Sequence, residues 1–419
     1  MIIVALVLLT LIGAPLFAVI AASAMLGFRA ADIPLTAVPI EVFGIAETPI
    51  LLAIPLFTFA GYVLAESQAP LRLVRLTTAL VGWIPGGVAM VAIVVCAIFT
   101  AFTGGSGVTI IALGAALLPA LLKAGYDEQF SLGLITSAGC LGLLFAPSLP
   151  LILYGVVTET SIDDMFVAGV VPGTLMMLGL AAYCLVRSSG NRVPLSTFSL
   201  SEVASAMRAA WIDIPLPIIV LGGIYSGIFA VSEAAAVTAV YVVVAEVLVH
   251  RDITWRAIPG IMRESMVLVG AILLILGLSL ASTNVMIDAQ LPERLVAEVT
   301  TLVGGPVSFL ALLFVFLLVL GAVLDIFAAL LLVVPLIAPI AAQYQIDPVH
   351  LGILFIANME LGYLAPPMGR NLVVASYRFN LPILSVYRAV FPFLVVLLIT
   401  VVIITFVPQL SLWPLGSRG

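Results

Sequence analysis

Long runs of apolar residues without a charged side chain constrain the fold of this sequence more than any other feature. The runs cover residues 1–28, 76–122, 131–158, 165–186, 265–287 and 326–346. About 20 apolar residues span the hydrocarbon core of a bilayer as a helix, so the second run has room for about two passages. None of the runs alternates apolar and polar residues, as the strands of a membrane barrel would. The sequence therefore predicts an all-α polytopic membrane protein.

Composition and charge exclude two other classes of protein. Hydrophobic residues make up 63% of the chain and charged residues 9%, whereas about a quarter of the residues of a soluble domain are charged. A formal net charge of −6 provides no basic surface for a nucleic acid. The lipid bilayer is therefore the expected partner, and no nucleic acid is expected. We interpret Cys96, Cys140 and Cys184, which lie inside apolar runs without metal-ligand spacing, as packing residues.

Apolar segments and basic clusters divide the chain into two membrane halves. Helices are expected over residues 2–22, 51–64, 81–101, 130–157, 166–186, 214–229, 234–250, 266–281, 303–324, 350–376 and 389–407. The positive-inside rule assigns to the cytoplasmic side the basic clusters at 72–75, 187–208, 251–263 and 378–388. The polar stretch 191–210 is the expected linker between a first half over 1–190 and a second half over 211–419.

The two halves share a sequence repeat. A shift of 220 positions places, without a gap, Pro119 on Pro339, Asp127 on Asp347, Leu141 on Leu361, Gly142 on Gly362, Leu144 on Leu364 and Pro147 on Pro367. Matches of Pro, Gly and Asp in one register are not expected by chance. Secondary transporters are commonly built from such repeats, with the binding site at the repeat interface near the middle of the membrane. The offset alone does not distinguish parallel from inverted repeats.

Each half also contains two interruptions of its apolar runs. The first is a re-entrant hairpin, expected at about 103–125 and 322–343, and the second is a broken helix, expected at about 130–157 and 348–376. Proline removes a backbone donor and clashes with the preceding turn, so a helix unwinds there and frees carbonyl oxygens. Such oxygens suit sodium, while half-helix N-termini attract an anion. Simple kinks in packed helices are the alternative, but the recurrence in register favours paired sites.

Polar residues at the broken helices are the candidates for substrate binding. Arg370 can form two parallel hydrogen bonds with a carboxylate. The alternatives are an internal ion pair of Arg370 with Glu360 or Asp325, or a guanidinium that reaches the cytoplasmic interface. The predicted substrate-binding residues are Arg370, Asn371, Ser148 and Asn358.

The sequence shows no arrangement of catalytic residues. It lacks a serine with a histidine in plausible reach, an Asp-rich pair for magnesium and a Gly-rich phosphate loop that ends in lysine. We therefore expect a protein that is not an enzyme and that takes its energy from an ion gradient or from another subunit. The rival class is a membrane-embedded lipid-modifying enzyme, which would need an acidic pair in a lipid-facing cleft that the sequence does not show.

Several motifs spread over essentially the whole chain resemble those of one transporter family. They are residues 54–57 (IPLF), 60–61 (AG), 103–106 (TGGS), 147–150 (PSLP), 154–158 (YGVVT), 222–227 (GGIYSG), 233–236 (EAAA) and 358–371. With these motifs the sequence resembles the large membrane subunit of tripartite ATP-independent periplasmic (TRAP) transporters, the DctM-like family.

This resemblance implies an elevator-type secondary transporter of the ion-transporter superfamily, with inverted repeats, two helical hairpins and sodium as the co-transported ion. It also implies a bacterial inner-membrane location and two partners. One is a small four-helix membrane subunit, and the other is a periplasmic substrate-binding protein that delivers an organic acid such as a dicarboxylate. The alternative is a stand-alone ion-coupled anion symporter of the same superfamily.

The resemblance further implies two sodium sites. The first contains Thr103, Ser106, Gly142, Phe145 and Ala146. The second contains Asp325, Gly362, Ala365 and Met368. This sequence departs from the family pattern at Ala146, where proline is frequent, at Ala365, where threonine is frequent, and at Arg370, whose position is frequently apolar.

Overall fold

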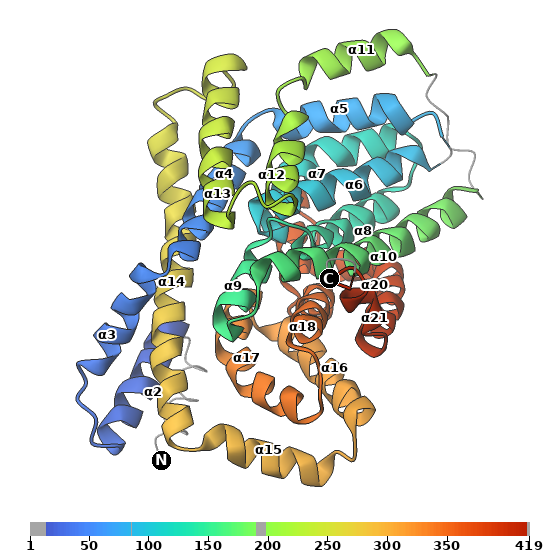
Figure 1. Cartoon of the computed structure of the whole chain (residues 1–419). Coiled ribbons are helices and arrows are strands. Elements are labelled where there is room, and N and C mark those ends of the chain that lie inside the picture. Colours follow the sequence, from blue (N-terminus) through green and yellow to red (C-terminus); the bar gives the residue numbers. More distant parts are fainter. Residues whose placement is uncertain (1–13, 85, 190–197, 417–419) are drawn as a thin grey trace.

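The described part of the chain is built from helices. The computed structural model describes residues 14–84, 86–189 and 198–416, and within these ranges it contains no β-strand (Figure 1). Nine segments of this part are helical, long enough and apolar enough to cross a membrane, which confirms the prediction of an all-α polytopic membrane protein. The beginning of the helix predicted over 2–22 and residues 191–197 of the predicted linker lie outside the described residues.

The helices fall into a first part, a connection and a second part. The first part contains α2 (Leu16–Ala30), α3 (Ala37–Gly44), the 3-10 turns η1 (Ile45–Glu47) and η2 (Pro49–Leu52), α4 (Ala53–Glu66), α5 (Ala69–Val81), α6 (Gly87–Thr103), α7 (Ser106–Lys123), α8 (Glu128–Ala138), the 3-10 turn η3 (Leu141–Leu144), α9 (Leu149–Thr158) and α10 (Ile162–Ser189). The connection contains α11 (Leu200–Ala209) and α12 (Pro215–Tyr225). The second part contains α13 (Val231–Val243), the π-helical turn η4 (Val244–Val249), α14 (Ile258–Asp288), α15 (Leu291–Leu302), α16 (Pro306–Val323), α17 (Ile326–Gln343), α18 (Pro348–Gly362), α19 (Arg370–Phe379), α20 (Ile383–Phe406) and α21 (Gln409–Leu412).

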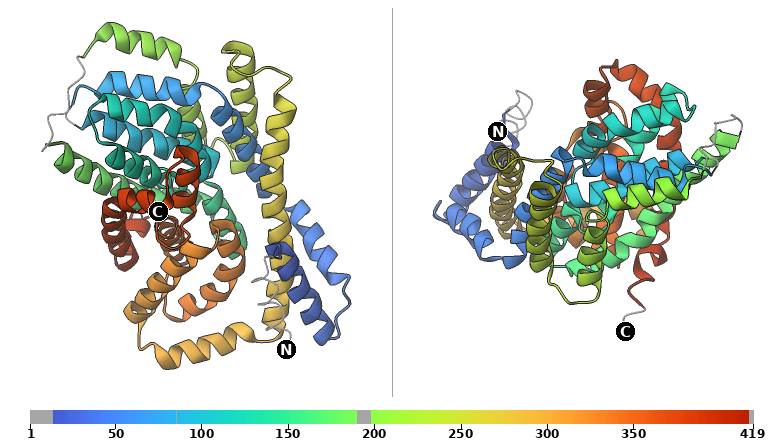
Figure 2. Two further views of the ribbon diagram at one scale, coloured as in Figure 1. Left: turned by 180° about the vertical axis from the view of Figure 1, so that it is seen from behind. Right: turned by 90° about the horizontal axis from the view of Figure 1, so that it is seen from above.

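The 220-residue offset relates these helices pair by pair. It carries the bounds of α7 onto those of α17, and it carries α9 onto α19 to within one residue. The tertiary contacts follow the same relation, because α7 packs against α19 and α17 packs against α9. The amphipathic helices α5 and α15 are also related by the offset, yet they lie at opposite ends of the molecule (Figures 1 and 2). The two repeats are therefore inverted.

Each repeat contributes one helical hairpin. The first consists of α6 and α7, and the second consists of α16 and α17. The hairpins follow α5 and α15 directly, so they enter the molecule from opposite ends (Figure 1). The predicted hairpins at 103–125 and 322–343 cover only the tip and the returning helix of each hairpin. The entering helices α6 and α16 are predicted as separate membrane spans because their sequences are predominantly apolar.

A second group of helices, which we call the scaffold, stands beside the hairpins. It contains α2, α3, α4, α13 and α14, and it forms one side of the molecule (Figures 1 and 2). The inverted repeat is visible here too, because α13 packs against α4 in the way that α2 packs against α14. Helix α14 has 31 residues and runs along the whole scaffold. The scaffold therefore provides a continuous surface against which α6, α7 and α17 pack.

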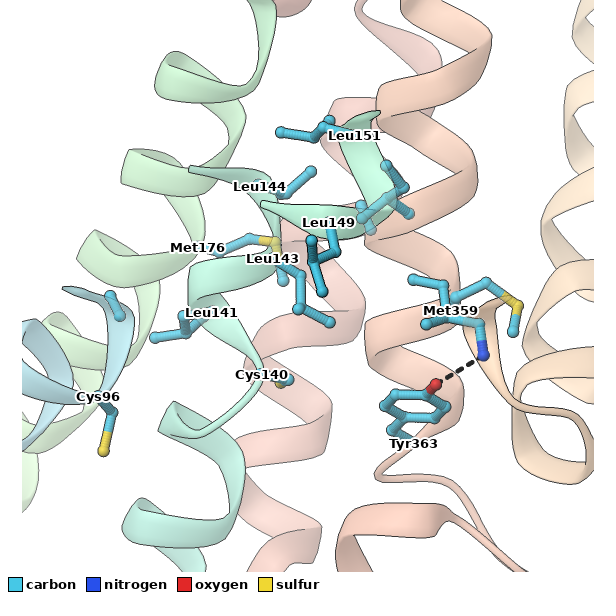
Figure 3. Packing of buried hydrophobic residues seen from close by; sticks show 14 of the residues in the cluster. Cys96, Cys140, Leu141, Leu143, Leu144, Leu149, Leu151, Met176, Met359 and Tyr363 are labelled. Atoms are coloured by element: carbon cyan, nitrogen blue, oxygen red, sulfur yellow. Dashed lines mark hydrogen bonds between the residues drawn. The ribbon is translucent and has the colours of Figure 1, made fainter. Parts of the chain in front are cut away.

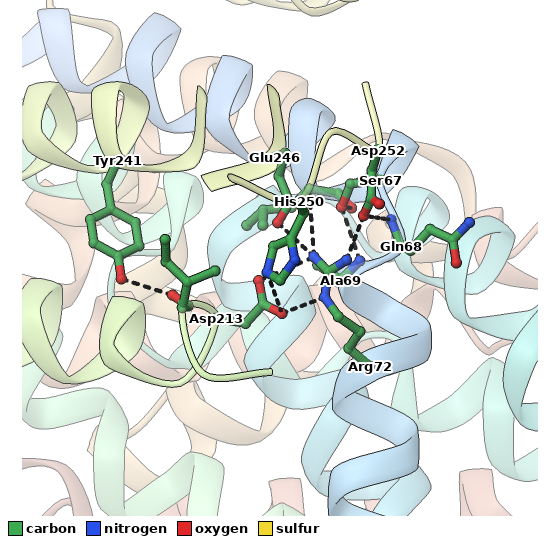
Figure 4. A network of polar contacts seen from close by, with 11 residues as sticks. Ser67, Gln68, Ala69, Arg72, Asp213, Tyr241, Glu246, His250 and Asp252 are labelled. Carbon is green, nitrogen blue, oxygen red and sulfur yellow. Dashed lines mark hydrogen bonds and ion pairs between the residues drawn. The ribbon is translucent and has the colours of Figure 1, made fainter. Parts of the chain in front are cut away.

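A buried network around Arg72 joins α5 to the end of the scaffold (Figure 4). The guanidinium donates to Asp213 at 2.6 Å and to Glu246 at 2.8 Å, and it also contacts Asp252. Burial raises the pKa of the Asp252 carboxyl, but hydrogen bonds from Arg72 and from the Gln68 N–H outweigh burial and lower this pKa below its usual value. The network also places the predicted basic clusters at 72–75 and 251–263 at one end of the molecule.

The linker predicted over 191–210 contains a helix. Helix α11 is capped by the Ser199 hydroxyl, which accepts from the Glu202 N–H at 3.4 Å. Its Glu202 side chain accepts from Arg75 of α5 at 2.8 Å. The polar composition of this stretch predicts a loop, but residues 200–209 form an amphipathic helix that lies against α5. Composition misleads here because a short surface helix needs only one narrow apolar face and is otherwise polar.

Close backbone contacts hold each broken helix against a hairpin. A Cβ atom at Gly142 would lie 2.3 Å from the Ala97 carbonyl oxygen and 2.6 Å from the Ala101 nitrogen. A Cβ atom at Gly362 would lie 2.5 Å from the Gly321 Cα. The 220-residue offset carries both members of the Gly142–Ala101 contact onto the Gly362–Gly321 contact. Figure 3 shows the leucines of η3 packed in this region, together with the buried, free Cys96 and Cys140.

These contacts predict the effect of adding one methyl group. Gly142→Ala and Gly362→Ala each force backbone apart, and overpacking of this kind costs about 1–3 kcal/mol. Both variants should lower the midpoint of thermal unfolding of the purified protein. Gly270→Ala is the matched control, because a methyl group at this position inside α14 meets nothing within 4 Å. Equal midpoints for Gly362→Ala and Gly270→Ala would contradict the close approach.

Candidate functional site

The first two residues of α19 bind the tips of both hairpins. The Asn371 side-chain oxygen accepts from the Ser106 hydroxyl at 2.7 Å, and Ser106 is the first residue of α7. The Arg370 guanidinium forms an ion pair with Asp325, which immediately precedes α17. Two tips that come from opposite ends of the molecule thus converge on consecutive residues where the second broken helix resumes.

Asp325 is held by two further groups besides its ion pair. Its side chain accepts from the Phe327 N–H at 2.9 Å and so caps α17. The Tyr363 hydroxyl donates to the same carboxylate at 3.2 Å. It also accepts from the Ile326 N–H at 2.6 Å, the hydrogen bond drawn at Tyr363 in Figure 3. The Tyr363 ring centre also lies 5.9 Å from the Arg370 guanidinium carbon, within range of a cation–π contact. The carboxylate is therefore positioned independently of Arg370.

A cavity of about 390 Å³ opens beside this ion pair. It is lined by the end of α16 and the tip at 321–325 on one side, and by Met368, Arg370, Val373 and Val374 on the other. The Arg370 side chain is 45% exposed and that of Asp325 is 34% exposed, so both charges can be reached from water. Small-molecule sites have volumes of about 300–1,000 Å³. The cavity therefore has room for a small organic anion next to a guanidinium.

The tip of the first hairpin carries a cluster of hydroxyl groups. The Thr100 hydroxyl lies 2.6 Å from that of Thr109 and 2.7 Å from the Gly139 carbonyl oxygen at the end of α8. The Thr103 hydroxyl lies 3.4 Å from that of Thr109. Hydroxyl and carbonyl oxygens are suitable ligands for a hard cation. Sequence reasoning missed Thr100 and Thr109, although both flank the TGGS turn at one helical turn from its ends.

Gly104 shapes this tip. Its φ of +64° lies in the left-handed region, and the glycine ends α6 so that the chain can turn directly into α7. The predicted sodium ligands Thr103 and Ser106 are thereby held on either side of the turn, each almost completely buried.

The other predicted sodium ligands of the first half lie in the unwound segment between α8 and α9. Gly142 packs on α6, as described above. Phe145 and Ala146 line an apolar cavity of about 130 Å³ between α6, α10 and α12. The side chains of these two residues carry no oxygen, so only their backbone oxygens remain as potential ligands.

The predicted ligands of the second half divide between the cavity and the packed interior. Asp325 and Met368 line the 390 Å³ cavity, and Met368 is largely exposed there. Gly362 is buried at the end of α18, and Ala365 is buried in the turn region that follows this helix. The structure thus brings Asp325 and Met368 together with Arg370, while Gly362 contacts Gly321 of the hairpin.

Several buried polar atoms in this region have no hydrogen-bond partner among the described residues. They are the Ser148 hydroxyl, the Asn358 side-chain oxygen, both Glu360 carboxylate oxygens and the Asn371 side-chain nitrogen. An unsatisfied buried polar group costs about 1–3 kcal/mol, and such groups often await a ligand or an ordered water. Of the two carboxylates considered as partners of Arg370, Asp325 makes the contact, whereas Glu360 makes none.

Comparison with known proteins identifies similar chains over most of this length. Residues 1–410 match the family described as "Tripartite ATP-independent periplasmic transporter, DctM component". The C4-dicarboxylate TRAP transporter large permease protein DctM of Pseudomonas aeruginosa is 36% identical over 375 residues, which cover 89% of this chain and 88% of the relative. The ectoine/5-hydroxyectoine TRAP transporter large permease protein UehC of Ruegeria pomeroyi is 32% identical, and the match covers 97% of this chain and 96% of the relative.

A solved structure shares the fold. The YdaH transporter of Alcanivorax borkumensis, whose crystal structure is described as having an unusual topology, matches 91% of this chain and 88% of its own chain. The TM-score is 0.62 and the sequence identity is 13%. At this identity the likeness concerns the fold alone, and it agrees with a polytopic helical architecture.

The contact between Ser106 and Asn371 predicts a stability effect. Ser106→Ala removes the one hydrogen bond found for the Asn371 side chain and leaves a buried amide unpaired, at a cost of about 1–3 kcal/mol. We expect a lower midpoint of thermal unfolding for Ser106→Ala. Ser308→Ala is the matched control, because the exposed Ser308 hydroxyl bonds only to the nearby Gly305 carbonyl.

A second variant separates this contact from a local effect at the hairpin tip. If the two side chains interact, the losses of Ser106→Ala and Asn371→Ala add to more than the loss measured in the double variant. Strictly additive losses would show that the tip and α19 are not coupled.

Proposed function

The chain belongs to the DctM family of tripartite ATP-independent periplasmic transporters, and we propose that it couples the entry of sodium to the uptake of a small organic acid. As a member it is a multi-pass membrane protein and a large permease subunit, and its relatives are transporter subunits rather than enzymes. The observation that carries the proposal is the convergence of both hairpin tips on Arg370 and Asn371 beside a cavity of about 390 Å³.

The substrate carboxylate would bind at the start of α19. Arg370 offers a half-exposed guanidinium whose fork geometry matches a carboxylate. Asn371 offers a side-chain nitrogen without a partner, and the unpaired Ser148 hydroxyl is a further potential donor. The unpaired side-chain oxygen of Asn358 can only accept, so it would serve a hydroxyl group of the substrate rather than its carboxylate. The N-terminus of α19 adds the positive end of a helix dipole, although the N–H groups of Asn371 and Leu372 already bond to the carbonyl oxygens of Tyr363 and Gly369. These features favour an anionic group at this position.

Sodium would bind at the two hairpin tips. The proposed first site contains Thr103, Ser106 and backbone oxygens of Gly142, Phe145 and Ala146, and the hydroxyls of Thr100 and Thr109 lie next to it. The proposed second site contains Asp325, Gly362, Ala365 and Met368. Its carboxylate is the strongest single ligand for a cation among these groups, and it lines the same cavity as Arg370.

The proposed transport cycle is an elevator movement of the hairpins past the scaffold. Helices α5 and α15 connect the scaffold to the two hairpins along the chain, at opposite ends of the molecule (Figure 1). In this proposal the chain works in the bacterial inner membrane with a small membrane subunit and with a periplasmic substrate-binding protein. The word "tripartite" in the family description supports such an assembly.

Sodium coupling predicts a strict ion requirement. Proteoliposomes that contain the permease and its partner subunits should accumulate the cognate organic acid only when a sodium gradient points inward. Initial uptake should be measured with sodium, and with potassium in its place at the same membrane potential. Undiminished uptake in potassium alone would contradict the proposed sodium coupling.

Carboxylate binding predicts the effect of a conservative change at Arg370. Arg370→Lys keeps the positive charge but loses the fork of parallel donors, each charge-assisted bond contributing about 1.5–3 kcal/mol. The substrate concentration for half-maximal uptake should rise about tenfold or more. Arg263→Lys, on an exposed position of α14, is the matched control. Unchanged half-saturation in Arg370→Lys, at normal expression, would reject the binding role.

A further inference from the structure

The ion pair between Arg370 and Asp325 joins the group proposed to bind the substrate to the group proposed to bind sodium. We propose that it is an exchange pair: sodium replaces Arg370 at Asp325, and the substrate carboxylate replaces Asp325 at Arg370. Each ligand thereby releases the residue that the other ligand needs. This inference rests on the proposed function and adds the residues that make the two ligands depend on each other.

The contacts around the pair favour exchange. Among the described residues, Arg370 forms an ion pair with Asp325 and with no other carboxylate, and the reverse holds for Asp325. Either residue alone is therefore left without its compensating charge when the pair opens. Asp325 keeps its hydrogen bonds from the Phe327 N–H and the Tyr363 hydroxyl after Arg370 leaves. A carboxylate held in this way presents its remaining lone pairs to an incoming cation without moving.

Accessibility separates this pair from the other arginine network of the protein. Arg72 is 12% exposed and contacts three carboxylates, of which Glu246 is completely buried (Figure 4). Removing such a buried guanidinium would strand several charges, so the Arg72 network is suited to a fixed joint. Arg370 and Asp325 are 45% and 34% exposed and line a cavity, so water and ions can reach both. Exposed ion pairs are weak and can be broken by competing ions.

The exchange makes binding of the two ligands cooperative. Sodium alone must displace Arg370 and leaves a guanidinium unpaired, while the carboxylate alone leaves Asp325 unpaired. When both bind, every charge at the cavity has a partner again. By linkage, the factor by which sodium raises carboxylate affinity equals the factor by which the carboxylate raises sodium affinity. The net result is a site that fills with cation and anion together.

Sodium binding without substrate tests this inference directly. Full-length permease in lipid nanodiscs is heated at increasing concentrations of sodium chloride, with choline chloride keeping the total salt constant. The sodium concentration that gives half of the maximal rise in the unfolding midpoint is the sodium half-saturation. Arg370→Gln removes the internal competitor for Asp325. We expect its half-saturation to fall by about tenfold, the effect of losing one charge-assisted contact. Arg263→Gln, the matched control, should behave as wild type.

The outcomes distinguish failure of the exchange pair from failure of the sodium coupling on which it rests. A normal sodium response in wild type with an unchanged or weaker response in Arg370→Gln overturns the exchange and leaves sodium coupling standing. No sodium response in wild type overturns both. If Arg370→Gln does not fold, Arg370→Lys replaces it: its ammonium competes less well, so a smaller fall in half-saturation supports the exchange and an unchanged value overturns it.

Discussion

The start of α19 is the point on which the arrangement of this protein depends. Arg370 and Asn371 are neighbours in the chain, yet one binds the tip of the second hairpin and the other binds the tip of the first. The Ser106–Asn371 contact is buried, where polar side chains that lose their partners are costly, so it fixes the position of the first tip. The half-exposed Arg370–Asp325 pair holds the second tip more weakly. Because the contacts come from opposite directions, α19 can hold both tips only if the second broken helix unwinds between Gly362 and Arg370.

The inverted repeat explains why two tips meet at all. Each broken helix is pressed against the entering helix of its own hairpin through a glycine contact, Gly142 on Ala101 and Gly362 on Gly321. Its resuming half then packs against the hairpin of the other repeat, α9 against α17 and α19 against α7. The chemistry is less symmetric than the backbone. The offset pairs Arg370 with Pro150 and Asp325 with Gly105, so the charged groups belong to the second repeat alone.

Much of this arrangement could be predicted from the sequence, because apolar runs and Pro/Gly interruptions are local signals. The broken helices and the hairpin tips follow from them, and the list of alternatives for Arg370 included Asp325. What could not be predicted depends on contacts between distant segments. The choice of Asp325 over Glu360 requires knowing that the second tip reaches α19. The Thr100 cluster requires the Gly139 carbonyl from another helix, and the limits of each hairpin require knowing which apolar helix pairs with which.

The central claim is that the tips and the start of α19 together form the place where sodium and the carboxylate bind. An electron cryo-microscopy map of the permease, saturated with sodium and a transported carboxylate, tests it most directly. The account predicts density for the anion against Arg370 in the cavity beside the second tip, with Arg370 separated from Asp325 and a cation density at that carboxylate. An intact Arg370–Asp325 pair with the anion bound elsewhere would contradict it.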